Sequence, residues 1–228
     1  MGVAGNLAGV RERIAQACGR AGRDPASVKL VAVSKVQPVD AIREALEAGQ
    51  RAFGENYAQE LREKADAIGE PSGIEWHFLG ALQTNKVKMV VGKVAMVHTC
   101  DRPSLAQELN KRAAVLGRVQ RVLIEVNLAE EPQKGGIAPR ELRSFLDVIG
   151  KLPALRCEGF MCIPPAEEDA RKHFRRLREL RDELGGAAAL PDLSMGMSAD
   201  YEAAIEEGAT LVRVGTAIFG ERPPKAQG

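Results

Sequence analysis

The chain has 228 residues, and its 32 basic and 31 acidic side chains leave a formal net charge of +1. A charge this balanced excludes a general electrostatic attraction to nucleic acid or acidic membranes, and aromatic residues, at 4%, are too few for a base-stacking platform. The length is typical of one domain, so we expect a single domain over residues 1–228.

The first predicted element is a helix from Leu7 to Ala21, because apolar residues recur there at helical spacing. Strand-like apolar runs then alternate with amphipathic helical stretches along the chain. The predicted strands lie near 28–35, 51–56, 75–80, 94–100, 120–128, 155–163, 191–197 and 210–216. The predicted helices between them lie near 38–49, 57–69, 84–91, 102–117, 138–151, 167–185 and 199–207.

This alternation predicts an α/β fold with a parallel sheet and right-handed crossovers. Eight strand–helix units in about 200 residues fit a closed (β/α)8 TIM barrel near the lower size limit, with an extra N-terminal helix. A doubly wound open sheet is the alternative.

Nothing in the sequence predicts a membrane anchor, a secretion signal or a metal centre. No apolar run approaches the length of a membrane span, and the first residues lack the basic region and apolar core of a signal peptide. We therefore expect a cytoplasmic protein. The cysteines match neither a zinc-ligand spacing nor a disulfide framework, so we expect them reduced and packed, with no metal. They are Cys18, Cys100, Cys157 and Cys162.

Lys35 ends the apolar run at 28–35. Strand alternation puts it on one face with Val31 and Val33, and in a barrel this amine would reach the mouth. A lysine is costly to desolvate as a cation, and lysines at such mouths form Schiff bases with carbonyl compounds. The alternative is a strand-end lysine whose amine extends to solvent.

Glycines and hydroxyl residues follow the last two predicted strands. Gly196, Ser198, Gly215 and Thr216 resemble a phosphate cradle, because glycine lets backbone N–H groups approach an anion and hydroxyls add donors. Ordinary helix capping and turn formation are the alternative. Arg213 shares a strand face with Gly215, and its buried charge needs an acceptor, either a ligand heteroatom or a structural carboxylate.

Two further residues lie near the ends of predicted strands. Asn56, with Glu55, follows the second strand and is placed to orient the lysine or a ligand, or to cap a loop. His77 is either a base or a packed, hydrogen-bonded strand histidine.

A Schiff-base lysine, a phosphate cradle and an inward arginine together suggest pyridoxal 5'-phosphate. The aldehyde would meet Lys35, the phosphate the cradle, and the pyridine nitrogen Arg213. An arginine there disfavours protonation of the ring, which limits carbanion chemistry.

Five ordered segments resemble the signatures of one family over essentially the whole chain. They lie at 32–35, 53–57, 76–86, 194–198 and 212–216. The family is that of the pyridoxal phosphate homeostasis proteins (proline synthase co-transcribed proteins), which is similar to the barrel domain of alanine racemases, the fold-type III pyridoxal phosphate enzymes. The segment at 128–135 departs from the serine- and glycine-containing stretch usual in the family, which leaves the contacts of the loop at 128–136 open.

The resemblance implies a role for each predicted site residue. Lys35 carries the Schiff base and Arg213 lies near the pyridine nitrogen. Asn56 and His77 lie beside the ring. The phosphate is held by Ser198, Gly215 and Thr216.

The resemblance also implies the function. The expected protein binds pyridoxal phosphate and serves intracellular vitamin B6 homeostasis without established catalysis, so no catalytic residue is assigned. Pyridoxal-phosphate-dependent apo-enzymes are the expected partners. The sequence stops just after the eighth predicted strand, which leaves out the second domain of alanine racemases, so we expect a monomer. An amino-acid racemase or related weak enzyme is the alternative, and a class I aldolase acting through Lys35 is a third hypothesis.

Overall fold

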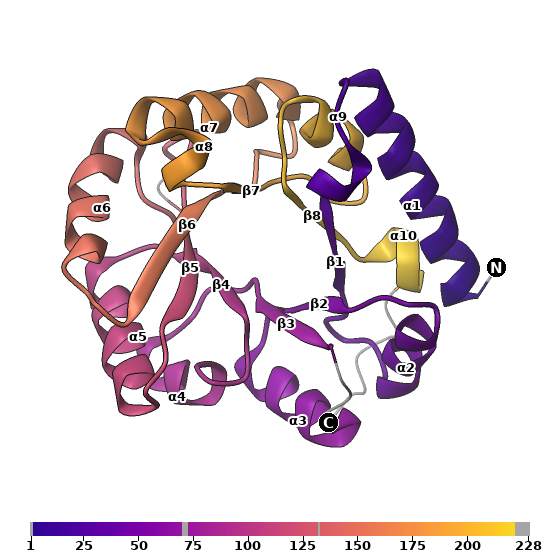
Figure 1. Ribbon diagram of the computed structural model, residues 1–228, viewed down its shortest axis with the longest axis horizontal. Coiled ribbons are helices and arrows are strands. Elements are labelled where there is room, and N and C mark those ends of the chain that lie inside the picture. Colours follow the sequence, from indigo (N-terminus) through magenta and orange to yellow (C-terminus); the bar gives the residue numbers. More distant parts are fainter. Residues whose placement is uncertain (1, 70–72, 132, 222–228) are drawn as a thin grey trace.

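The structure, a computed structural model, describes residues 2–69, 73–131 and 133–221. Within these residues eight parallel strands follow one another around a closed barrel, which the pairing of β8 with β1 completes (Figure 1). The predicted (β/α)8 TIM barrel is confirmed, and the open sheet is excluded. The predicted domain range of 1–228 includes residues 1, 70–72, 132 and 222–228, which lie outside the described residues. The strands are β1 (Lys29–Val33), β2 (Ala52–Glu55), β3 (Glu75–Phe78), β4 (Met96–Cys100), β5 (Gln120–Glu125), β6 (Leu155–Met161), β7 (Asp192–Ser194) and β8 (Leu211–Val214).

Helices form an outer ring around the barrel (Figure 1). Every predicted helix has a counterpart in the structure, and the stretch predicted at 84–91 is divided into a 3-10 turn and a short α-helix. The α-helices are α1 (Val3–Arg20), α2 (Val39–Glu47), α3 (Ala58–Ile68), α4 (Val87–Val90), α5 (Pro103–Val115), α6 (Leu142–Gly150), α7 (Ala170–Leu184), α8 (Gly186–Ala189), α9 (Tyr201–Glu206) and α10 (Thr216–Phe219). The 3-10 turns are η1 (Pro25–Ser27), η2 (Thr84–Lys86) and η3 (Pro139–Glu141). None of the described helices is both long and apolar enough to cross a bilayer.

The predicted N-terminal helix is α1, which packs against α9 and α10 beside β1 and β8 (Figure 1). The Asn6 amide donates to the carbonyl oxygen of Ile218 at 2.9 Å, and Arg20 on the exposed side pairs with Glu202 and Glu206. Helix α10 has only four residues, so α1 supplies most of the helical cover at this part of the ring. The buried residues of α1 are those whose spacing predicted the helix: Leu7, Val10, Ile14, Ala17 and Cys18.

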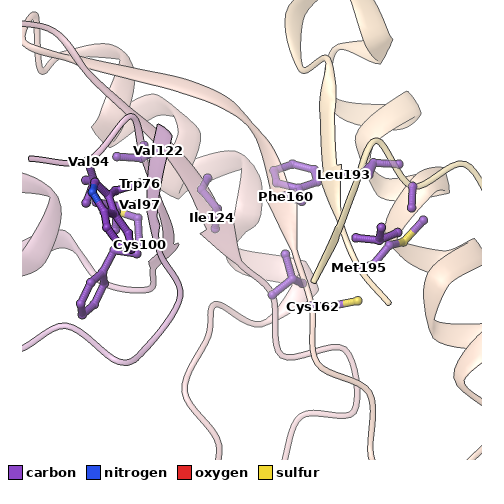
Figure 2. Packing of buried hydrophobic residues seen from close by; sticks show 14 of the residues in the cluster. Trp76, Val94, Val97, Cys100, Val122, Ile124, Phe160, Cys162, Leu193 and Met195 are labelled. Atoms are coloured by element: carbon purple, nitrogen blue, oxygen red, sulfur yellow. The ribbon is translucent and has the colours of Figure 1, made fainter. Parts of the chain in front are cut away.

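The strands are buried on both faces, as parallel strands are. Their outward side chains form the main core with the helices, and Figure 2 shows part of it, where Val97, Ile124 and Phe160 come from three neighbouring strands. Their inward side chains form a second, smaller cluster inside the barrel. It consists of Val31, Ala52, Leu79, Met96, Leu123, Met161 and Leu211.

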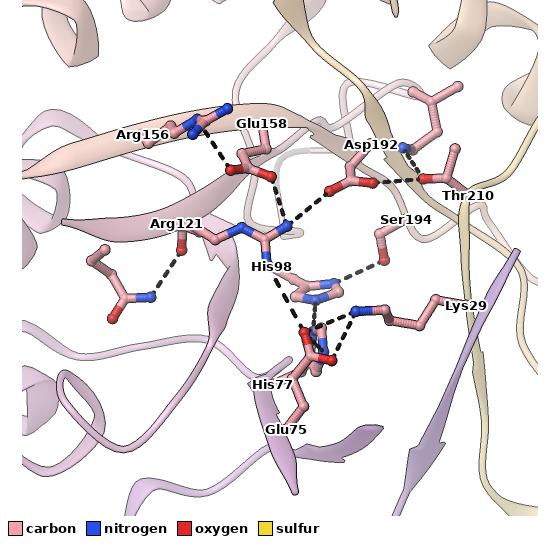
Figure 3. Close-up of polar contacts among 12 residues, drawn as sticks. Lys29, Glu75, His77, His98, Arg121, Arg156, Glu158, Asp192, Ser194 and Thr210 are labelled. Carbon is pink, nitrogen blue, oxygen red and sulfur yellow. Dashed lines mark hydrogen bonds and ion pairs between the residues drawn. The ribbon is translucent and has the colours of Figure 1, made fainter. Parts of the chain in front are cut away.

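Charged residues gather inside the barrel near the amino ends of the strands (Figure 3). Lys29 pairs with Glu75 at 2.8 Å, and Arg121 lies 2.7 Å from Glu158 and 3.6 Å from Asp192. The inward residues of a barrel form layers from alternate strands, and Lys29, Glu75, Arg121 and Asp192 come from β1, β3, β5 and β7. These charges neutralise one another at the amino end, opposite the end where TIM barrels place their ligands.

Several strands are shorter than predicted at their carboxyl ends. β1 stops at Val33, so Lys35 lies in the turn after the strand. β8 stops at Val214, just before Gly215 and Thr216. Burial continues past the ends of these strands at Ser34, Lys35 and Gly215, whereas Thr216 is exposed.

Candidate functional site

A cavity of about 290 Å³ opens at the carboxyl end of the barrel, a size at the lower end of small-molecule pockets. Six of the seven predicted site residues line it together, although they come from the carboxyl ends of four strands, β1, β2, β7 and β8. Apolar side chains form the rest of its wall. The lining residues are Val33, Lys35, Asn56, Leu79, Ile163, Met197, Ser198, Ala199, Arg213, Gly215 and Thr216.

The turn that carries Lys35 is strained. Val36 has φ of +63°, a left-handed conformation that is unusual for a β-branched residue and costs about 1–3 kcal/mol. Its N–H donates to the Glu60 carboxylate on α3 at 2.5 Å, and the N–H of Gln37 donates to the carbonyl oxygen of Ser34 at 3.0 Å. These hydrogen bonds fix the backbone on both sides of Lys35.

A buried ion cluster formed by Lys64, Glu55 and Glu60 contacts this turn at Ser34. The Lys64 ammonium on α3 donates to the Ser34 carbonyl, to Glu55 at 2.8 Å and to Glu60 at 2.6 Å. The Ser34 hydroxyl also donates to Glu55 at 2.6 Å. Glu55 is fully buried, and burial raises the pKa of its carboxyl while the Lys64 ammonium opposes that shift. The cluster joins β1, β2 and α3 directly behind Lys35.

Arg213 is buried at the base of the cavity and bonds to neutral acceptors. It donates to the Ser194 hydroxyl at 2.7 Å and to the carbonyl oxygen of Cys162 at 2.9 Å. Among the described residues, no carboxylate lies within ion-pair distance of it, so the structural carboxylate that the sequence left open is not there. Burial lowers the pKa of its guanidinium. A positive charge and unused N–H donors therefore face the cavity.

Glu125 is a second ionisable group near Arg213, and no sequence pattern singled it out. It ends β5, and its carboxylate lies close to that of Asp101, since a Cβ built on Gly135 would lie near both. Burial, with the nearby Asp101 carboxylate, raises the pKa of Glu125 to about 7, and Arg213 opposes the shift. This carboxyl group therefore exchanges its proton near neutral pH.

The turns after β7 and β8 meet at the edge of the cavity. The Ser198 hydroxyl accepts long hydrogen bonds from the backbone N–H groups of Gly215 and Ala217, at 3.4 and 3.5 Å. Gly196 has φ of +91°, and a Cβ there would lie 2.6 Å from the Cβ of Ala204, so only glycine fits this turn. Because these hydrogen bonds are long, their donors retain capacity for an anion in the cavity.

His77 does not line the cavity. Alternation along β3 points Glu75, His77 and Leu79 into the barrel, and Leu79 is the one that reaches the mouth. The His77 side chain lies deeper, fully buried, with Nδ1 2.8 Å from Nε2 of His98. We therefore leave His77 out of the site. Within the described residues, no group of three or more His, Cys, Asp or Glu is placed to hold a metal ion.

Comparison with known proteins gives consistent matches. A family model described as "Alanine racemase, N-terminal domain" matches residues 6–223. A pyridoxal phosphate homeostasis protein of Aquifex aeolicus is 50% identical over 221 residues, covering 95% of this chain and 96% of the relative. The one from Escherichia coli K12 is 44% identical over 227 residues, covering 96% and 97%.

Solved structures agree with these matches. PipY of Synechococcus elongatus, solved with pyridoxal phosphate bound, is 37% identical with a TM-score of 0.83, covering 96% of this chain and 100% of PipY. The alanine racemase of Corynebacterium glutamicum, at 19% identity, has a TM-score of 0.69, with 99% of this chain and 62% of the racemase covered. The second likeness shows the fold alone.

We predict that Lys64→Met lowers the free energy of unfolding by about 3–5 kcal/mol, because it leaves the Glu55 carboxylate buried without its counter-charge. Urea unfolding measures the effect. Lys93→Met is the matched control, since Lys93 pairs with Asp66 at the surface and its loss should cost less than about 1 kcal/mol. Equal small effects of the two substitutions would show that the buried cluster does not support the turn.

Proposed function

We propose that this chain, which belongs to the pyridoxal phosphate homeostasis protein family, binds pyridoxal phosphate at the carboxyl end of its barrel. Its proposed role is to serve the intracellular supply of that cofactor. The observation that carries the proposal is that Lys35, Arg213 and Ser198 line one cavity. An amine, a guanidinium and an anion-binding turn are the groups that an aldehyde, a pyridine nitrogen and a phosphate require.

Lys35 is the proposed point of covalent attachment, as a Schiff base with the cofactor's aldehyde. The hydrogen bonds of Val36 and Gln37 support this assignment, because they fix the backbone from which the Lys35 side chain enters the cavity. A fixed amine has less conformational entropy to lose on binding than one on a free loop. The Lys64 cluster stabilises the same turn from the opposite side.

Arg213 and Asn56 are the proposed neighbours of the ring. Arg213 has N–H donors left over after Ser194 and Cys162, and a guanidinium can only donate, so the pyridine nitrogen would accept and remain unprotonated. When bound, the cofactor supplies an electron sink, and an unprotonated ring makes that sink weak. Val33, Leu79 and Met197 offer apolar contact to the ring.

The proposed phosphate site is formed by Ser198, Gly215 and Thr216. Two hydroxyls and the backbone N–H groups of this turn can converge on one anion. A Cβ on Gly215 would lie 3.2 Å from the carbonyl oxygen of Val33, so glycine lets the turn after β8 approach β1 closely.

The lining favours binding over catalysis. Among the described residues that line the cavity, Lys35 is the one side chain suited to proton transfer, because none is Tyr, His, Cys, Asp or Glu. Racemisation uses an acid–base group on each face of the substrate carbon. The second candidate is an amino-acid racemase or related weak enzyme. It is favoured by Glu125, a carboxyl group near Arg213 whose pKa is raised to about 7. Delivery to apo-enzymes, a monomeric state and a cytoplasmic location stay predictions from the sequence.

The first test is the visible spectrum. Titration of the cofactor-free chain with pyridoxal phosphate should produce a Schiff-base absorption band, and borohydride followed by peptide mapping should locate the modified residue at Lys35. Lys35→Ala should abolish the band, whereas Lys88→Ala, which removes an exposed lysine of α4, should leave it unchanged. A full band in Lys35→Ala would refute the assignment.

The phosphate site is tested by comparing two ligands. Ser198→Ala should weaken pyridoxal phosphate binding by about 1–2 kcal/mol, roughly 5- to 30-fold, through the lost hydrogen bond. Binding of pyridoxal, which has no phosphate, should change little. Ser144→Ala removes an exposed hydroxyl of α6 and serves as the control. Equal weakening for both ligands would place Ser198 elsewhere than at the phosphate.

Proton exchange separates the two candidate functions. The cofactor-loaded chain is incubated with L-alanine in deuterated water, and incorporation of deuterium at Cα is followed by NMR. We expect exchange no faster than with free pyridoxal phosphate and no D-alanine. Rapid exchange with racemisation, lost in Glu125→Gln, would favour the enzyme.

A further inference from the structure

A chain of polar contacts runs through the barrel from Ser194 to Glu75 (Figure 3). We call Ser194, His98, His77 and Glu75 the interior chain. Ser194 Oγ lies 2.9 Å from Nδ1 of His98, and Nε2 of His98 lies 2.8 Å from Nδ1 of His77. Nε2 of His77 lies 3.6 Å from the Glu75 carboxylate, which is beyond hydrogen-bond distance but close enough for electrostatic attraction. The interior chain thus joins the cavity end of the barrel to its charged amino end.

The carboxylate at the Glu75 end of the interior chain sets the direction of its hydrogen bonds. Arg213 can only donate, so Ser194 accepts from it, and the Ser194 hydroxyl proton is then available to donate to Nδ1 of His98. His98 then carries its proton on Nε2 and donates to Nδ1 of His77. This leaves the Nε2 proton of His77 facing the Glu75 carboxylate. The reverse direction would set a nitrogen lone pair against that carboxylate.

Burial and charge agree with this arrangement of protons. Ser194, His98 and His77 are fully buried, and burial lowers the pKa of both imidazoles, which favours neutral rings. His77 and Lys29 lower the pKa of Glu75 to about 2, although its partial burial opposes them, so this group is a carboxylate at neutral pH. Each ring therefore has one donor and one acceptor nitrogen, as the interior chain requires.

We propose that Ser194 and His98 are positioning residues for Arg213, a role that rests on the proposed function. Ser194 holds one terminal nitrogen of the guanidinium and the Cys162 carbonyl holds the other, which fixes the plane of the group. By accepting from the Ser194 hydroxyl, His98 holds it in an orientation in which its oxygen accepts from Arg213. The remaining N–H donors of Arg213 are thereby aimed at the ring of the bound cofactor.

The hydrogen-bond direction is tested without the cofactor. The chain has three histidines, and His173→Gln leaves only the two of the interior chain. In ¹⁵N-histidine-labelled protein at neutral pH, both rings should be neutral and carry the proton on Nε2. A cationic ring, or a proton on Nδ1 of either ring, would overturn the proposal.

The positioning role is tested with the cofactor. Ser194→Ala should weaken pyridoxal phosphate binding about tenfold, as expected for one lost hydrogen bond to a charged group, and should shift the absorption maximum of the bound cofactor. Ser194→Thr, which retains a hydroxyl, should restore both properties at least in part. Thr99→Val is the control, because it removes a buried barrel hydroxyl that bonds to the Gly80 carbonyl outside the interior chain.

The outcomes separate this proposal from the proposed function. If borohydride modifies Lys35 but Ser194→Ala binds with unchanged affinity and spectrum, the positioning role is wrong while the cofactor site stands. If borohydride leaves Lys35 unmodified in the unaltered chain, the Lys35 Schiff base is wrong, and the histidine spectra still decide the direction of the interior chain. Should Ser194→Ala fail to fold, Ser194→Cys gives the same comparison with a weaker acceptor.

Discussion

The pairing of β8 with β1 is the constraint on which the site depends. Val31 lies opposite Arg213 in this ladder and Lys29 opposite Leu211, so the turn after β1 meets the turn after β8. A slip of one residue would turn every inward side chain outward and move Arg213 from the barrel interior into the apolar layer beneath the helices. The proposed lysine, guanidinium and phosphate turn are thus placed by one set of backbone hydrogen bonds.

Polarity inside the barrel changes along its axis. At the amino end, charges are paired with opposite charges, as in Lys29 with Glu75. In the middle, two neutral imidazoles share hydrogen bonds, and at the mouth Arg213 faces a cavity with its charge held only by neutral acceptors. Buried charge is costly unless it is compensated, so Arg213, which has no ion-pair partner among the described residues, marks a place suited to a polar ligand.

The sequence predicted the barrel because apolar runs and helical periodicities alternate without interruption. It placed six site residues together because the carboxyl ends of barrel strands converge on one face. His77 could not be placed in the same way, since its depth depends on the register of β3, which local pattern does not contain. Lys64 was missed because Glu60 and Lys64 have the i,i+4 spacing of an ordinary exposed helix pair, whereas the lysine is buried. The left-handed Val36 was also beyond prediction, because only the tertiary contacts make that conformation tolerable.

The contact of α1 with α9 and α10 has a consequence for how the molecule folds. The hydrogen bond from Asn6 to Ile218 spans 212 positions, while most strand pairs join neighbours in the sequence. Closing so long a loop carries an entropic cost that local pairing avoids, and contacts of high sequence separation slow folding. Intermediates with most of the barrel formed but its last seam open are therefore expected during synthesis, and they would expose the apolar stripe of α1 and the free edge of β1 to other chains.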